Sequence, residues 1–276
     1  MNNILKQGIN SNMLKTIALV AMVIDHIGFY FAEMLPPFIY FSCRFIGRIA
    51  MPIFVYLLVQ GFFYTKNLKK YIIRVGVFAA ITQLVLTILM VINIKYVPNY
   101  ICATLVYTKG NILWTFVIIL CILKLLHEDI IIKKWTYNKN LCLKICVTFI
   151  AIIISSIIPL DYGSEALVLG ILMYYIEKFK VKLMIEKTRS TLSIKSIVLK
   201  SISEEKTKLV YLSMVLFALC SLIIYFNAYW TVIFAIIPIA LYNGEKGKLN
   251  MKYIYYITFI LHHALLYSVA MIITLT

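Results

Sequence analysis

The sequence predicts an all-α protein, a polytopic bundle of transmembrane helices, and three observations support this prediction. Of the 276 residues, 63% are hydrophobic and only 14% are charged, whereas a soluble domain has about half apolar residues. The apolar residues form long blocks separated by short polar stretches, which is typical of repeated bilayer crossings. Helices are expected because a backbone exposed to lipid must satisfy its own hydrogen bonds. The sequence shows no repeat, so residues 1–276 are predicted to form a single transmembrane domain.

About nine spans are predicted from the apolar blocks. In chain order they cover 13–33, 44–63, 70–92, 111–126, 141–159, 164–177, 209–226, 229–243 and 253–275. The first block is expected to remain as a helix, because its apolar run continues past Asp25 and His26 and no small-residue cleavage site follows. The second contains Pro52, which loosens a helix. Several of these spans are near the length of roughly twenty residues that crosses a bilayer, and the short sixth and eighth are expected to be tilted, broken or partly re-entrant.

Basic residues set the predicted orientation. All but four of the 27 Lys and Arg residues lie in alternate segments, which become the inner segments if the N-terminus is cytoplasmic. This bias predicts a cytoplasmic N-terminus and an outer C-terminus. The basic stretch 178–208 is predicted to be a cytoplasmic loop that contacts anionic membrane lipid, with a polyanionic cofactor as the alternative. Because the positive charges fall between apolar blocks, the net charge of +16 does not indicate nucleic-acid binding.

Ionisable residues inside the spans form the candidate site. Asp25 and His26 lie in the outer half of the first span, within "IDHIG", and Asp161 and Tyr162 lie in the short outer loop "PLDYGSE". Ionisable groups at membrane depth mark a functional site by default. His26 is a candidate general base, since an imidazole titrates near neutral pH. The alternative is that Asp25 and His26 pair with arginines as structural contacts between helices.

Arg44 and Arg48 supply those cations. They are four residues apart in "CRFIGRIAMPIF" and therefore share a helix face, while Gly47 allows close approach of another helix. Two guanidinium groups suit phosphate or carboxylate recognition. The alternative is anchoring at the membrane interface, where long cationic side chains extend towards water.

The remaining histidines do not predict a metal site. His262 and His263 fall in the middle of the last span and are adjacent, so they are expected on different helix faces. Four histidines at these spacings do not provide a recognisable ligand set. We therefore expect no metal cofactor.

Several motifs together resemble one family over nearly the whole chain. They are "LKTIALVAMVIDHIG" (14–28), "FIGRIAMPIFVYLLVQGFFYTKNLKKYIIRVGVFAAITQ" (45–83), "GNILWTFVIIL" (110–120), "DYGSEALVLGILMYY" (161–175) and "LYNGEKG" (241–247). The sequence resembles the TraX-like proteins, integral membrane proteins named for an acetylase that modifies the N-terminus of conjugative pilin. The resemblance implies a multi-pass protein of the bacterial cell (cytoplasmic) membrane. It further implies acetyl transfer from cytoplasmic acetyl-CoA to an acceptor at the outer face.

The resemblance carries over positions by motif, among them Asp25, His26, Arg48 and Asp161. The roles below, and the inclusion of Arg44, are hypotheses from the chemistry and predicted depth of these residues. His26 would be the base, with Asp161 or Asp25 orienting it, and Arg44 and Arg48 would bind the acceptor or stabilise the oxyanion. The other positions matched as substrate- or cofactor-binding residues are Tyr162, Asn243 and His262. The chain departs from the family pattern at Gln60, where an acidic residue is often found, and before His262, where a proline is missing.

Three function classes are compatible with these features. The leading one is a membrane-bound acetyltransferase or acyltransferase, whose acceptor is an amine or hydroxyl of an exported peptide, glycan or lipid. The second is a small-solute or proton-coupled transporter that uses Asp25, His26 and Arg48 as its path. The third is a non-catalytic assembly factor. An odd number of spans without an internal repeat is unlike the inverted-repeat transporters.

Overall fold

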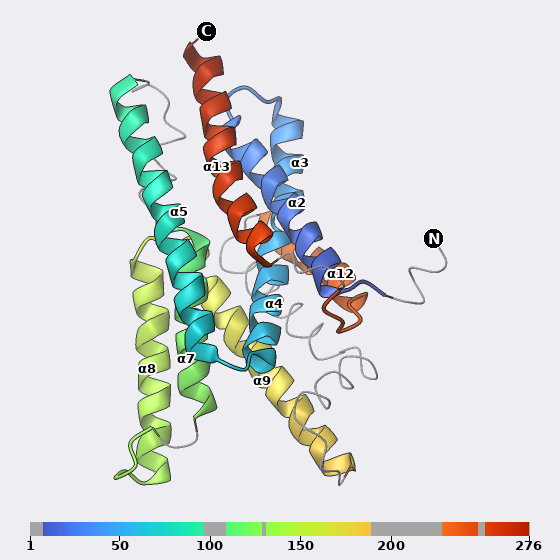
Figure 1. Cartoon of the computed structure of the whole chain (residues 1–276), viewed down its shortest axis with the longest axis vertical. Coiled ribbons are helices and arrows are strands. Elements are labelled where there is room, and N and C mark those ends of the chain that lie inside the picture. Colours follow the sequence, from blue (N-terminus) through green and yellow to red (C-terminus); the bar gives the residue numbers. More distant parts are fainter. Residues whose placement is uncertain (1–7, 97–108, 129–130, 189–227, 248–251, 276) are drawn as a thin grey trace.

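A computed structural model describes residues 8–96, 109–128, 131–188, 228–247 and 252–275, and its regular structure is helical (Figure 1). In these ranges the extended contacts are two isolated bridges, Ile9 with Tyr242 and Gly110 with Leu160. The helices are α2 (Ser11–Tyr30), α3 (Pro37–Gly47), α4 (Ala50–Tyr64), α5 (Leu68–Tyr96), α7 (Ile112–His127), α8 (Tyr137–Ile157), α9 (Gly163–Thr188), the 3₁₀ helix η1 (Ala228–Ala235), α12 (Ile236–Ala240) and α13 (Lys252–Leu275). The prediction of an all-helical protein is confirmed for the described residues.

Five helical stretches are long and apolar enough to cross a membrane. They are Ser11–Tyr30, Pro37–Tyr64, Leu68–Ile92, Tyr137–Ile157 and Tyr253–Thr274, and two shorter apolar helices cover Ile112–His127 and Thr231–Ala240. Such a set fits a multi-pass membrane protein. The count of nine spans and the orientation of the termini stay predictions. One of the nine, 209–226, lies outside the described residues, as does most of the basic stretch 178–208.

The second span differs from the prediction of one helix over 44–63. The helical stretch begins earlier, at Pro37, and is interrupted at Arg48 and Ile49 between α3 and α4. Pro52 accounts for the interruption, because it has no N–H to donate to the carbonyl of Arg48 four residues before it. The break places the Arg48 side chain at a helix end.

Two other predicted spans have different boundaries. α9 continues to Thr188 instead of ending near residue 177, because the Lys, Glu and Met residues that end the apolar block are good helix formers. The short span 229–243, which was expected to be tilted, broken or partly re-entrant, is broken into the 3₁₀ helix η1 and the short α12. Pro238 cannot donate to the carbonyl of Phe234, which disfavours α-helical bonding in the turn before it.

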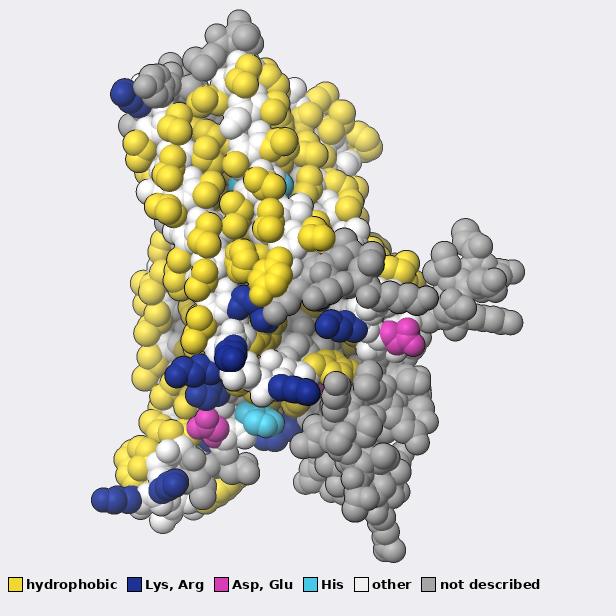
Figure 2. Space-filling model, in the orientation of Figure 1, with side chains coloured by type: hydrophobic (Ala, Val, Ile, Leu, Met, Phe, Trp, Pro, Cys, Tyr) yellow, Lys and Arg dark blue, Asp and Glu magenta, His cyan; other side chains and the backbone are white. Residues whose placement is uncertain are grey.

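α4 lies at the centre of the bundle, where it contacts α2, α7, α9 and η1 (Figure 1). Its side chains are mostly buried, including Ile53, Val55 and Val59. By contrast, α8 exposes large apolar side chains such as Phe149 and Ile157, as a helix facing lipid does. On the face drawn in Figure 2, hydrophobic side chains cover the upper part and Lys and Arg side chains gather below them. The surface is thus apolar over α8 and over the upper part of this face, as expected for regions that contact lipid.

Candidate functional site

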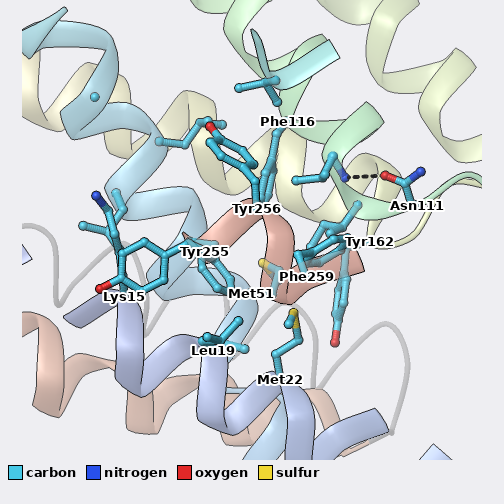
Figure 3. A pocket seen from close by; sticks show the side chains of 18 of the residues that line it. Lys15, Leu19, Met22, Met51, Asn111, Phe116, Tyr162, Tyr255, Tyr256 and Phe259 are labelled. Carbon is cyan, nitrogen blue, oxygen red and sulfur yellow. Dashed lines mark hydrogen bonds between the residues drawn. The ribbon is translucent and has the colours of Figure 1, made fainter. Parts of the chain in front are cut away.

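A cavity of about 1040 Å³ runs among α2, α4, α5, α7 and α13. This volume is at the upper end of the range for small-molecule sites. Its middle is walled by apolar side chains, among them Met22, Met51, Phe116 and Phe259, which surround the space in Figure 3. Polar residues line both ends. In the predicted orientation one end faces the outside and the other faces the cytoplasm.

At the predicted outer end, Asp25 of α2 pairs with Arg44 of α3. The Asp25 Oδ2 atom lies 3.0 Å from Arg44 Nη1, and the two side chains are only 11% and 18% exposed. Arg44 Nη1 also donates to the backbone oxygen of Asp25 at 3.3 Å. The helices come this close because residue 47 is glycine: a Cβ there would overlap the Asp25 side chain. The pair fixes Arg44 beside the cavity that both residues line.

Arg48 and the loop between α8 and α9 complete this end. Arg48 Nη1 donates to the Tyr162 hydroxyl at 2.6 Å. Tyr162 has a φ of 52°, a left-handed conformation uncommon for residues with a side chain. The loop is held in place because the Asp161 N–H donates to Gly110 and the Thr115 hydroxyl donates to the Asp161 carbonyl. Burial raises the pKa of the Asp161 carboxyl above its ordinary value, and the nearby Asp25 charge adds to the rise.

His26 points from α2 towards two histidines of α13. Its Nδ1 atom lies 2.9 Å from the Met22 carbonyl and 3.1 Å from His262 Nε2. A carbonyl can only accept, so Nδ1 carries the proton and the Nε2 lone pair of His26 remains available. The ring centroid of His263 lies 4.4 Å from that of His26, and both residues line the cavity.

The predicted cytoplasmic end of the cavity is cationic and rich in tyrosine. Lys15, Arg74 and Lys246 line it, and among the described lining residues Glu245 is the acidic side chain at this end. Lys15 Nζ lies 5.6 Å from the centre of the Tyr255 ring, and both are labelled in Figure 3. The other tyrosines at this end are Tyr64, Tyr71, Tyr242 and Tyr256. Three cations against one carboxylate favour an anionic ligand.

Gln60 of α4 lines the cavity closer to this end. The residue is only 2% exposed, and neither atom of its side-chain amide has a hydrogen-bond partner among the described residues. A buried amide without partners is costly, so such a group marks a position where a ligand's polar atoms bind favourably.

The fold brings together most of the residues singled out from the sequence. The cavity lining includes Asp25, His26, Arg44, Arg48, Asp161 and Tyr162. His262 is buried behind His26 and is not in the lining. Asn243 is in the turn after α12, where its N–H donates to Ile9 and its side chain accepts from the N–H of Glu245. Asn243 therefore shapes the turn that presents Gly244 and Glu245, and its own side chain does not line the cavity.

The contacts of His26 differ from the predicted ones, in which Asp161 or Asp25 orients the ring. Asp25 contacts Arg44, and the Met22 carbonyl and His262 hold the His26 ring instead. His263 was not predicted as a site residue, because adjacent helical residues usually face different ways. Lys15 and Arg74 were not predicted either, although each is a single cation within a largely apolar stretch of sequence.

Comparison with known proteins identifies similar sequences. The model of the family described as "TraX protein" matches residues 10–270. A probable fimbrial assembly protein FimC (serogroup H1) of Dichelobacter nodosus is 39% identical over 70 residues, which is 25% of this chain and 28% of that protein. The chain thus matches about a quarter of this curated relative. No solved structure matches.

Proposed function

Because this chain belongs to the TraX family, we propose that it is a membrane-embedded acetyltransferase, which moves the acetyl group of cytoplasmic acetyl-CoA to an acceptor amine at the outer face. The observation that carries the proposal is one continuous cavity, lined by Lys15, Arg74 and Lys246 at one end and by His26, Arg44, Arg48, Lys109, Asp25 and Asp161 at the other. The family is linked to pilin acetylation, and a relative is named as a fimbrial assembly protein. Both support the N-terminus of an exported pilin-like peptide as the acceptor, with a glycan or lipid amine or hydroxyl as the alternative.

The cationic end suits the donor. Coenzyme A carries several phosphate charges, and Lys15, Arg74 and Lys246 provide compensating charge where those phosphates would enter from the cytoplasm. The pantetheine arm is narrow and carries two amides. The Gln60 amide can donate to and accept from such a group as the arm passes along the apolar middle. The thioester would then reach the outer end.

The outer end suits the acceptor and the chemistry. The Asp161 carboxylate would hold the incoming ammonium, which releases one proton to solvent to give the neutral amine, and the Nε2 atom of His26 would remove a second proton from the nitrogen as the amine attacks. The amine attacks the thioester carbonyl carbon, and the Arg48 guanidinium, aligned by Tyr162, stabilises the oxyanion. The C–S bond then breaks, the CoA sulfur takes the proton back from His26, and the products are the amide and free CoA. Arg44, paired with Asp25, holds α2 and α3 together at this end of the cavity. None of these steps uses a metal ion.

Purified protein with acetyl-labelled acetyl-CoA tests the proposal. A peptide with a free α-amine should gain the label while free CoA appears in equal amount, and the same peptide with a blocked amine should not. A continuous cavity is also what a transport path needs, so transport is the second candidate. Folded protein that releases no CoA and labels no acceptor, yet moves a solute across vesicles, would replace the first proposal with the second.

Arg74→Gln tests the donor end. We expect the variant to raise the KM for acetyl-CoA about tenfold, because a charged hydrogen bond to phosphate contributes roughly 1.5–3 kcal/mol, and to leave kcat nearly unchanged. Steady-state kinetics with varied acetyl-CoA provide the measurement. Lys70→Gln is the matched control, since Lys70 is an exposed cation of the same helix and does not line the cavity. Equal KM values for the two variants would place the CoA phosphates elsewhere.

A further inference from the structure

Three of the chain's four histidines converge at one point in the bundle. His26 comes from α2, and His262 and His263 come from α13; one ring nitrogen of each lies within 4.8 Å of the other two. His262 and His263 are 7% and 5% exposed. Three imidazoles packed against one another in an apolar interior need a reason, because each carries polar nitrogens that cost free energy when buried.

Each δ nitrogen has a partner outside the three rings, and His26 Nδ1 also lies 3.1 Å from His262 Nε2, inside the cluster. His26 Nδ1 lies 2.9 Å from the Met22 carbonyl, His262 Nδ1 lies 3.1 Å from the Thr258 carbonyl, and His263 Nδ1 lies 2.9 Å from the Tyr30 hydroxyl. Histidines that bind metals commonly engage their second ring nitrogen in this way, which fixes the tautomer and the direction of the ligating nitrogen. With their Nδ1 protons directed at carbonyls, His26 and His262 carry their lone pairs on Nε2. The Tyr30 hydroxyl can accept from His263 Nδ1, which leaves Nε2 of His263 as its ligating atom. To bind one ion, the His26 ring has to turn away from its Nδ1 contact with His262 Nε2.

We propose that His26, His262 and His263 form a site for a divalent transition ion of the Zn²⁺ class, with an open fourth position towards the cavity. Imidazole nitrogens are preferred ligands for Zn²⁺, and three protein ligands with a water is a common arrangement. Bonds of about 2.1 Å require ligand nitrogens roughly 3.4 Å apart, so small side-chain rotations close the separations. His26 and His263 line the cavity, which gives the ion a polar route of entry. The expectation of no metal site rested on sequence spacing, whereas 236 residues separate His26 from His262.

The ion regulates the site and is not a cofactor of the transfer. This consequence, unlike the binding itself, rests on the proposed function. A bound ion takes the His26 Nε2 lone pair that would accept the proton of the acceptor, so base catalysis stops while the ion is present. Zinc should therefore inhibit acetyl transfer reversibly, and a chelator should restore it.

Metal binding is measured on full-length protein purified without a histidine tag and stripped with chelator. Titration with Co²⁺, whose visible absorption reports four-coordinate nitrogen ligation, and competition by Zn²⁺ should show one site per chain. His263→Ala should weaken binding at least about 100-fold, and Tyr30→Phe, which removes only the outer partner, about tenfold. His127→Ala is the control, since His127 lies at the end of α7, bonded to Tyr174, and should bind as the wild type does.

Two results would overturn the site: folded wild-type protein that binds no Co²⁺, or binding that is the same in His263→Ala, Tyr30→Phe and His127→Ala. Tyr30→Phe keeps the test decisive if His263→Ala does not fold. The regulatory role is read from the ratio of transfer rates with and without Zn²⁺, which should approach one in His263→Ala. Protein that binds the ion but never transfers acetyl would overturn the proposed function and leave the metal site standing.

Discussion

His26→Ala is expected to lower kcat for acetyl transfer by about 10²–10⁴-fold, the range contributed by a positioned general base. The Met22 carbonyl accepts a hydrogen bond from Nδ1 of His26, so the proton is on Nδ1. The lone pair on Nε2 can then act as the base. Alanine removes that atom without disturbing the neighbouring Asp25–Arg44 pair. The measurement is the single-turnover rate of labelled acetyl transfer in detergent, with protein amount and monodispersity matched to the wild type.

His127→Ala is the matched control for this variant, because it removes a histidine of α7 that contacts Phe62 and Tyr174 and does not line the cavity. Its rate should stay within about twofold of the wild type. His262→Ala should lower the transfer rate by less than His26→Ala does, since His262 holds the His26 ring without lining the cavity. It should also shift the pH profile of kcat. A His26→Ala rate close to that of His127→Ala would remove His26 from the mechanism.

Arg44→Ala is expected to lower the free energy of unfolding by roughly 3–5 kcal/mol, because it leaves the Asp25 carboxylate buried without its partner. Replacing both residues, as Asp25→Asn with Arg44→Met, should recover a large part of the loss, since a neutral pair has no charge to desolvate. Reversible unfolding in mixed detergent micelles, followed by the near-ultraviolet signal, gives the free energies.

Lys69→Ala, which removes an exposed cation at the start of α5, is the control and should change stability by less than about 0.5 kcal/mol. If Arg44→Ala is no less stable than Lys69→Ala, the Asp25–Arg44 pair is not a buried structural contact. If the double variant is no more stable than Arg44→Ala, the loss does not come from an isolated charge.

Local patterns in the sequence predicted the helical elements well where apolar length decided them. α2, α5 and α13 lie close to the predicted spans, and Pro52 was expected to loosen the second span, as the break at Arg48 shows. The end of α9 was missed because a helix does not stop where hydrophobicity stops. The short span 229–243 was expected to be tilted, broken or partly re-entrant, and it is broken into η1 and α12; its 3₁₀ geometry was not predicted, because hydropathy does not distinguish a 3₁₀ helix from an α-helix.

The outer end of the cavity was predictable because its residues were expected at one membrane depth, in three segments of the chain. Asp25, Arg44 and Asp161 meet for this reason. The histidine cluster was not predictable in the same way, since it depends on the packing of α2 against α13, which no local spacing encodes. Asn243 differs from the histidines: its motif was noticed in the sequence, but the residue forms a turn and does not line the cavity.

Sidedness of the transfer tests the central proposal most directly. Acetyl-labelled acetyl-CoA is sealed inside proteoliposomes, and a membrane-impermeant peptide with a free α-amine is supplied outside only. We expect the outer peptide to gain the label at a rate that requires His26, because one cavity joins the cationic end to the histidine end. Label that appears only when donor and acceptor are on the same side of the membrane would contradict it.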